Sequence, residues 1–282
     1  MPFDNGPSLV QASAWIAAFR GRSVVVKLGG ESLTKRSSVD RIARQIKVMT
    51  DCGLRCLIVH GAGVQVDQAC IERGIIPDKV GGRRITTPEV LEALVEVLSD
   101  LNKALCSELE RHGLETQGMS EGVHKAILCR RRPPTEREGR LVDWGEVGDI
   151  TGVDISLLSS VKIPVLPSLA WSADGPMNAN ADSCSSNLAI SVKAAKLIFA
   201  TSTPGVMRSM EDAGPISEVS SREVQSLLDS GIATGGMKAK LEECLKAVKG
   251  GVEQVHILSS REPHGMLREI FTDEGVGTLI RA

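Results

Sequence analysis

A lysine followed by two glycines is the first group in the sequence that could bind a phosphate. Lys27 ends an apolar run, and Gly29 and Gly30 follow after a single leucine. Glycines at the end of a strand let backbone N–H groups approach an anion closely, and the lysine adds a positive charge beside them. Because a lysine beside a glycine pair also occurs in ordinary tight turns, this signal becomes informative only together with a second one.

A second turn of small residues follows another apolar run. His60, Gly61, Ala62 and Gly63 come directly after the run 57–59. In open α/β sheets, ligands bind outside the carboxyl ends of the strands, so two such turns predict a phosphate site at that edge. Neither turn has the GxxxxGK[ST] spacing of a P-loop or the GxGxxG spacing of a dinucleotide-binding unit, which makes those two classes poor candidates.

The elements that must position these turns alternate along the whole chain. Apolar runs rich in β-branched residues predict buried parallel strands at 23–28, 54–59, 161–166, 196–200 and 254–258. Apolar residues at helical spacing predict helices at 39–49, 88–109, 183–193, 222–228 and 236–247. The charged segment 130–138, which contains two adjacent prolines, is expected to be an exposed loop or hairpin tip. The alternation predicts an α/β fold.

Composition excludes several classes of protein. A chain of 282 residues with 42% hydrophobic residues can bury a core as one large domain or two packed lobes. The net charge of −2 argues against a nucleic-acid binder. No apolar run approaches the roughly 20 residues that span a membrane. Seven cysteines without metal-ligand or disulfide spacing favour a reducing cytoplasm. With 2% aromatic residues, ligand recognition should depend on backbone amides and charges.

Six motifs occur in the order and approximate spacing of acetylglutamate kinases, so the chain resembles that branch of the amino acid kinase family. They are Lys-Leu-Gly-Gly at 27–30, His-Gly-Ala-Gly at 60–63, Gly-Arg-Arg-Ile-Thr at 82–86, Met-Asn-Ala-Asn-Ala-Asp at 177–182, Gly-Gly-Met-Lys-Ala-Lys at 235–240 and Phe-Thr-Asp-Glu-Gly-Val-Gly-Thr at 271–278. The resemblance implies a three-layer sandwich with an open, mainly parallel sheet between helices. It also implies one kinase domain over 1–282, with a helical extension at 1–21, a lobe for the acyl substrate and dimerisation at 22–177, and an ATP-binding lobe at 178–282.

The resemblance implies transfer of a phosphoryl group from ATP to the side-chain carboxylate of N-acetyl-L-glutamate, a step of arginine biosynthesis. Lys27 and Lys240 would contact the transferred group from opposite sides, and Asp182 would orient both lysines. The plain alternatives are a solvated helix lysine for Lys240 and a helix cap for Asp182. No general base is assigned, because a carboxylate acceptor has no proton to lose at neutral pH.

The same resemblance implies that four further residues bind the acceptor. Arg84 would hold a substrate carboxylate, since a guanidinium can bind one through two hydrogen bonds. Asn178 would bind the other polar groups, and Ala62 and Gly63 would offer backbone N–H groups to the acceptor carboxylate. Arg83 is expected on the surface. His60 is expected to have a structural role and no part in the chemistry.

Nucleotide binding is implied for six residues in three motifs. These are Gly29, Gly30, Thr201, Ser202, Gly205 and Met237. Mg²⁺ is expected to enter with ATP, bound mainly by phosphate oxygens and water, so no metal site made by the protein is predicted.

Two positions and one five-residue segment depart from the family pattern. Ala62 and Ser202 stand where the family usually has Gly and Asp, and residues 119–123 replace a Leu-Ser-Gly-Lys-Asp segment. The departures leave both lysines, Asp182 and Arg84 in place. They therefore affect the identity of the acceptor more than the reaction type.

Regulation is also implied. Residues 7–19 form a short amphipathic pattern outside the kinase core, and arginine-inhibited members of the family carry such a helix, which joins homodimers into a hexamer. His264, Glu269, Glu274 and Gly275 resemble the arginine site of those members. The plain alternative is a helix that packs on its own subunit.

Other functions remain open from sequence alone. A catalytically silent sensor of arginine or nucleotide would be compatible with Ala62 and Ser202. N-acetylaminoadipate differs from N-acetylglutamate by one methylene, which changes binding by only about 1–3 kcal/mol. Carbamate and aspartate kinases share the fold.

Overall fold

The computed structural model describes residues 9–120, 125–207 and 214–282. Its centre is a sheet with the strand order β14-β16-β15-β13-β1-β2-β10-β5. All neighbouring pairs in it are parallel except β15 with β16. The strands are β1 (Ser23–Leu28), β2 (Arg55–His60), β5 (Thr116–Gly118), β10 (Ile163–Pro167), β13 (Lys196–Thr201), β14 (Glu218–Ser220), β15 (Gln254–Ser259) and β16 (Thr278–Arg281).

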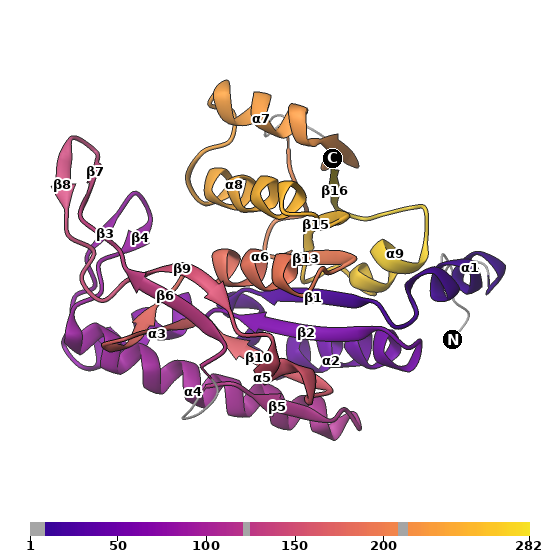
Figure 1. The fold of residues 1–282 in the computed structure, drawn as a ribbon, viewed down its shortest axis with the longest axis horizontal. Coiled ribbons are helices and arrows are strands. Elements are labelled where there is room, and N and C mark those ends of the chain that lie inside the picture. Colours follow the sequence, from indigo (N-terminus) through magenta and orange to yellow (C-terminus); the bar gives the residue numbers. More distant parts are fainter. Residues whose placement is uncertain (1–8, 121–124, 208–213) are drawn as a thin grey trace.

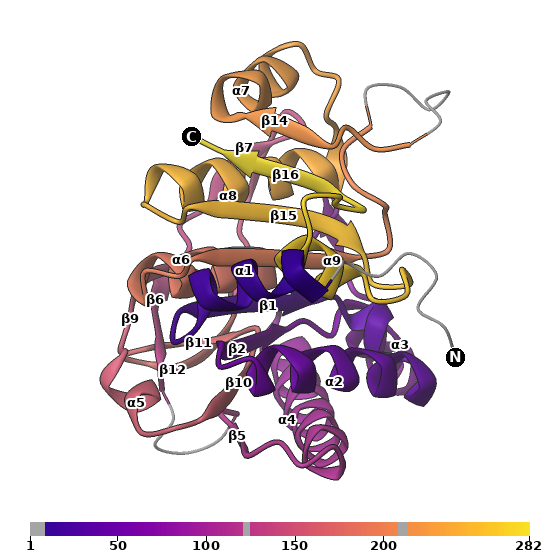
Figure 2. The same cartoon turned by 90° about the vertical axis from the view of Figure 1, so that its right-hand side faces the viewer.

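Helices cover both faces of this sheet (Figures 1 and 2). Alternate residues of a strand point to opposite faces, so Val25 of β1 packs with α6 and α8 while Val24 and Val26 pack with α2 and α9. The result is the predicted three-layer sandwich. The helices are α1 (Leu9–Phe19), α2 (Arg36–Asp51), α3 (Gly63–Glu72), α4 (Pro88–Arg111), α5 (Ser156–Ser159), α6 (Ala181–Ser191), α7 (Ser221–Asp229), α8 (Gly235–Lys249) and α9 (Gly265–Phe271), with a 3-10 helix, η1 (Gly30–Leu33).

A smaller sheet and two hairpins extend from the main sheet, and of these the sequence predicted only a loop or hairpin tip at 130–138. The smaller sheet has the order β12-β11-β6-β9. The hairpins pair β3 with β4 and β7 with β8, and Figure 1 shows both projecting beyond the main sheet. Short strands with charged side chains lack the apolar pattern on which sequence prediction depends. Their bounds are β3 (Lys79–Val80), β4 (Arg83–Arg84), β6 (Ile127–Arg131), β7 (Thr135–Arg137), β8 (Arg140–Val142), β9 (Gly148–Val153), β11 (Leu169–Ser172) and β12 (Gly175–Asn178).

The predicted elements agree with the structure to within three residues at each end. All five predicted strands belong to the main sheet, and 130–138 takes part in a hairpin as expected. Residues 1–8, at the start of the predicted extension, lie outside the described residues, as do 121–123 of the unusual segment. In the parts of the chain that the structure describes, no helix has the length and apolar character to cross a membrane.

Candidate active site

The two glycine-containing turns meet at the carboxyl edge of the main sheet, as predicted. β1 and β2 are parallel neighbours, and the Gly61 N–H donates to the Leu28 carbonyl at 3.0 Å. A Cβ at Gly30 would lie 3.1 Å from backbone atoms of Ala62, so a larger residue there would push the two turns apart. The Gln65 side chain then ties α3 to the first turn by donating to the Gly30 carbonyl at 2.7 Å.

Asp182 joins the two predicted catalytic lysines. Its Oδ1 lies 2.8 Å from Lys27 Nζ and its Oδ2 lies 2.6 Å from Lys240 Nζ. The three side chains are 14%, 11% and 9% exposed, respectively. The capping alternative for the Asp182 side chain is wrong, because Asn180 Oδ1 caps α6 by accepting from the N–H groups of Asp182 and Ser183.

The ion pairs decide the charges of these groups. Burial alone would raise the pKa of Asp182, but the charges and hydrogen bonds of Lys27 and Lys240 outweigh burial and hold this pKa well below its usual range. Burial lowers the pKa of Lys240, and the Asp182 carboxylate opposes this change. The Lys240 ammonium also lies 4.9 Å from the centre of the Phe199 ring, which attracts a cation. A carboxylate therefore lies between two ammonium groups.

A cavity of about 270 Å³ adjoins Lys27. This volume is close to the lower end of the range for small-molecule pockets, roughly 300–1,000 Å³. Four predicted acceptor-binding residues line it: Ala62, Gly63, Arg84 and Asn178. Gly29 and Gly30 line it as well, so the structure brings together the residues assigned to the acceptor and the first glycine turn.

The polar residues of the cavity are held by neighbours. Arg84 forms an ion pair with Asp67 of α3 at 2.7 Å and donates to the Gly63 carbonyl at 3.0 Å. Asn178 donates from Nδ2 to Thr86 Oγ1 at 2.9 Å. These contacts fix the guanidinium and the amide at the wall of the cavity, where they can bind a small polar molecule.

Two further arginines line the cavity, and one corrects an expectation. Arg83 was predicted to be on the surface, yet it is half-buried at the cavity wall. Arg132 also lines it, with its Nε 2.7 Å from Asp149 and its guanidinium 5.8 Å from the Trp144 ring centre. Neither has a signal in the sequence beyond the charge of its segment. Arg83 belongs to the β3–β4 hairpin, which was not predicted, and Arg132 belongs to 130–138, which was expected only as an exposed loop or hairpin tip.

The family model of the amino acid kinase family matches residues 22–259. The chain belongs to the amino acid kinase family. A protein named acetylglutamate kinase from Frankia casuarinae is 38% identical over 97% of this chain and 77% of the relative. An acetylglutamate kinase from Salinispora tropica is 37% identical over 97% of this chain and 94% of the relative.

Solved structures of amino acid kinase folds agree with the architecture. N-acetylglutamate synthase from Neisseria gonorrhoeae, crystallised with coenzyme A and N-acetyl-glutamate, superposes with a TM-score of 0.84 at 24% identity. The superposition covers 98% of this chain and 64% of that longer chain. At this identity the likeness supports the shared fold and no more.

The nucleotide residues implied by the amino acid kinase motifs follow β13 and begin α8. Thr201 ends β13, and the exposed Ser202 follows it. Gly205 is required for packing, because a Cβ there would lie 2.6 Å from Thr278 Oγ1 and 2.7 Å from Pro215 Cβ. Met237 is half-buried in the first turn of α8, three residues before Lys240. Ser202 lines a different depression from Gly29 and Gly30, between η1, α2 and the end of β15.

The residues implied for an arginine site lie on α9 and the segment after it. Glu269 is buried, its Oε1 accepts from the N–H groups of Val276 and Gly277 at 2.7 Å each, and its Oε2 lies 2.7 Å from His256 Nδ1. Gly275 packs against the same carboxylate. His264 precedes α9 and Glu274 follows it, so these two exposed residues lie beyond opposite ends of a helix about 10 Å long.

A buried lysine beside Glu269 escaped the sequence prediction. Lys196 Nζ donates to the Glu269 carbonyl at 3.0 Å and lies 4.7 Å from the Phe19 ring centre of α1. Burial lowers the pKa of Lys196 to about 8, opposed by the charge of Glu269. Its position at the start of an apolar strand is the only sequence signal, and lysines at strand ends are commonly exposed.

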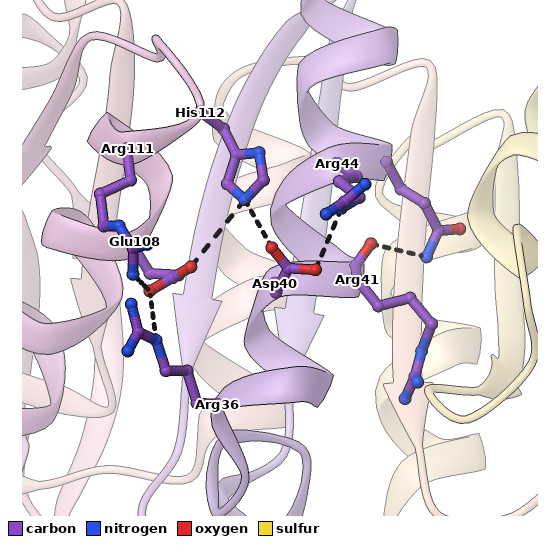
Figure 3. A network of polar contacts seen from close by, with 8 residues as sticks. Arg36, Asp40, Arg41, Arg44, Glu108, Arg111 and His112 are labelled. Carbon is purple, nitrogen blue, oxygen red and sulfur yellow. Dashed lines mark hydrogen bonds and ion pairs between the residues drawn. The ribbon is translucent and has the colours of Figure 1, made fainter.

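One group of possible metal ligands occurs among the described residues. Asp40 on α2, with Glu108 and His112 at the end of α4, place ligand atoms within 4.8 Å of one another. Figure 3 shows that arginines already occupy both carboxylates. Arg44 pairs with Asp40 at 3.0 Å, and Arg111 pairs with Glu108 at 3.1 Å. The group is best explained as a polar link between two helices.

His60 is fully buried behind the second turn. Its Nε2 lies 3.0 Å from Asn102 Nδ2, and burial lowers the pKa of His60 to about 4. The ring is therefore neutral at pH 7, and Nε2 accepts the hydrogen bond from Asn102. This arrangement agrees with a structural role for His60.

Proposed function

We propose that this chain transfers the γ-phosphoryl group of ATP to the side-chain carboxylate of N-acetyl-L-glutamate, in a step of arginine biosynthesis. The observation that carries the proposal is Asp182, which holds Lys27 and Lys240 beside a cavity that contains Arg84 and Asn178. Two relatives that bear the name acetylglutamate kinase, each aligned over 97% of this chain, support it.

In this proposal the two lysines stabilise the transferred group. A carboxylate oxygen of the acceptor attacks the γ-phosphorus, the bond from that phosphorus to the β–γ bridging oxygen breaks, and ADP leaves. Negative charge spreads over the phosphoryl oxygens in the transition state, so fixed cations on both sides lower the barrier. Asp182 keeps the lysines in position and acts on no proton. The acceptor carboxylate is already ionised, and the reaction needs no base.

We propose matching roles for the cavity residues. The N–H groups of Ala62 and Gly63 bind the reacting carboxylate, because they lie at the start of α3, where helix N–H groups have no partner within the helix. Arg84 binds the other carboxylate of the acceptor, and Asn178 binds its amide. Contacts from Asp67 and Thr86 fix both side chains before substrate arrives.

ATP is proposed to bind at the carboxyl edge beside α8. Gly29 and Gly30 approach its phosphates, while Thr201, Ser202, Gly205 and Met237 face the rest of the nucleotide. The start of α8, which lacks a side-chain cap, would attract phosphate oxygens. Among the described residues that line the cavity there is no Asp or Glu, and Asp182 is occupied by two lysines. Mg²⁺ therefore fits as an ion bound mainly by phosphate oxygens and water.

Hydroxylamine trapping of the acyl phosphate tests the reaction. With ATP, Mg²⁺ and N-acetyl-L-glutamate, we expect a hydroxamate, and less of it with N-acetylaminoadipate. Lys240→Ala should lower the rate roughly 10²-fold, because one fixed cation is lost. Lys238→Ala, an exposed lysine on the same helix, is the matched control and should change little. No hydroxamate from any acceptor would favour the silent sensor, and full activity of Lys240→Ala would refute the role of that lysine.

We further propose the assembly and compartment that the family resemblance implies. Residues 22–177 would form the lobe for the acceptor and the homodimer, residues 178–282 the lobe for ATP, and the protein would reside in the cytoplasm. Most residues of the cavity precede residue 178, which supports this division. A hexamer would form through α1, whose Val10 is 82% exposed.

Inhibition by arginine is proposed at α9 with Glu269, Gly275, His264 and Glu274. Supporting it, α1 packs beside α9, and Glu269 contacts Gly275. We expect arginine at millimolar concentration to lower activity, and a protein lacking residues 1–20 to lose both inhibition and higher assembly, as measured by initial rates and light scattering. Unchanged rates in arginine, with the same mass after truncation, would show instead that α1 packs only on its own subunit.

A further inference from the structure

The cavity beside Lys27 is lined by four cations. They are Lys27, Arg83, Arg84 and Arg132, and among the described lining residues none is acidic. N-acetyl-L-glutamate has two carboxylates, one of which reacts near Lys27. Lys27 is assigned to the transferred phosphoryl group and Arg84 to the remaining carboxylate, which leaves Arg83 and Arg132 without an assigned group.

The counter-ions of these cations separate one arginine from the rest. Lys27 is paired with Asp182, Arg84 with Asp67 and Arg132 with Asp149, at 2.7–2.8 Å. Arg83 has no such ion pair and no side-chain hydrogen bond within the described residues. It is the cation of the cavity wall that is left without a close anion.

The surroundings of Arg83 favour binding of an anion. Burial lowers the pKa of its guanidinium, and the positive charges of Arg132 and Arg137 lower it further. Glu242 and Glu243 oppose this only from beyond ion-pair distance. A half-buried guanidinium with cationic neighbours is stabilised by an anion that enters the cavity.

The position of Arg83 is fixed by its hairpin. Gly81 and Gly82, with φ of 55° and 74°, form the tight turn between β3 and β4, which requires positive φ at both central residues. Val80, paired with Arg83 across this turn, is buried in a small apolar cluster with Trp144. The hairpin is therefore anchored over the cavity, and Arg83 is held at its wall.

We propose that Arg83, next to Arg132, forms a second anion subsite, so that this kinase prefers acceptors with a third acidic group. An N-acylated glutamate whose acyl group ends in a carboxylate, such as N-succinyl-L-glutamate, has this chemistry. The proposal rests on the proposed function, because it assigns Arg84 to the carboxylate that N-acetylglutamate also has. Arg83 is then a specificity residue and takes no part in phosphoryl transfer.

Hydroxamate formation with the two acceptors tests this subsite. For the wild type, we expect kcat/KM to be at least about 10-fold higher with N-succinyl-L-glutamate than with N-acetyl-L-glutamate, the scale of one charged contact. Arg83→Gln should remove this preference and change kcat/KM for N-acetyl-L-glutamate less than about threefold. Arg83→Lys should keep part of the preference for N-succinyl-L-glutamate. Arg140→Gln, an exposed arginine of the neighbouring hairpin, controls for general loss of charge and should keep the preference.

The outcomes distinguish this inference from the proposed function. Phosphorylation of N-acetyl-L-glutamate without preference for the succinyl acceptor would overturn the subsite and leave the proposed function standing. An equal loss on both acceptors in Arg83→Gln, with thermal unfolding unchanged, would place Arg83 on a group common to both reactions, the shared carboxylate or ATP, and would also overturn the subsite. No hydroxamate from either acceptor would overturn both proposals. A preference for the succinyl acceptor that is lost in Arg83→Gln and kept in Arg140→Gln would support the anion subsite.

Discussion

Lys27→Met is expected to lower kcat by roughly 10²–10³-fold, the usual effect of removing one fixed group that stabilises transition-state charge. Lys27 follows Val26 in a central strand, and its ammonium is held 2.8 Å from Asp182. Methionine keeps most of the length and apolar packing of the side chain, so the sheet should remain intact. Because the lysine acts mainly in the transition state, KM should change much less than kcat.

Steady-state rates with ATP and N-acetyl-L-glutamate measure this effect. Lys249→Met is the control, since Lys249 is an exposed lysine at the end of α8 and outside the site. If Lys27→Met kept kcat within a few-fold of wild type, the proposed place of phosphoryl transfer would be wrong. A large rise in KM at unchanged kcat would make Lys27 a binding group only.

Asp182→Asn is expected to lower kcat roughly 10²-fold and to move the alkaline limb of its pH profile to lower pH. The wild-type carboxylate opposes the effect of burial on the pKa of Lys240. Without it, the pKa of Lys240 falls further and the lysine loses its proton at a lower pH. Because the charged lysine is the active form, the remaining activity of Asp182→Asn should rise as pH is lowered from 9 toward 7.

Profiles of kcat from pH 6 to 10 for the wild type and for Asp182→Asn test the direction of this shift. Asp174→Asn, at an exposed turn, should keep the wild-type profile. The variant should be checked for folding, because removing one member of a buried ion pair typically destabilises by about 3–5 kcal/mol. A folded Asp182→Asn with an unshifted alkaline limb would mean that Asp182 does not control the charge of Lys240.

Much of the fold followed from local patterns. Apolar runs in 23–28 and 54–59 predicted two strands, and the glycines after them predicted turns at one edge, which the structure confirms. The sequence placed both turns at the carboxyl edge of a sheet, and the structure showed that β1 and β2 are neighbours, which brings the two turns together. The ordered motifs also led to the correct family.

Other features depended on contacts between segments far apart in the sequence. Lys240 and Asp182 are 58 residues apart, and nothing local separates a solvated helix lysine from one that pairs with a carboxylate. Asn180 decided the question by capping α6, which left the Asp182 carboxylate to the lysines. Lys196 shows the same limit, because its ammonium is enclosed by α1, α9 and His256 of β15, which are all remote from it in the sequence.

The sequence by itself determined five strands of the main sheet, most of the long helices that cover it and the residue types at its carboxyl edge, because hydrophobic period and glycine turns are local properties. Only the tertiary structure decided which charges meet. It paired Lys27 and Lys240 through Asp182, and it placed Arg83 on the cavity wall, where none of the described residues forms an ion pair with it. Ion pairing and burial depend on distances between segments that are remote in the chain, and those distances exist only once the chain is folded.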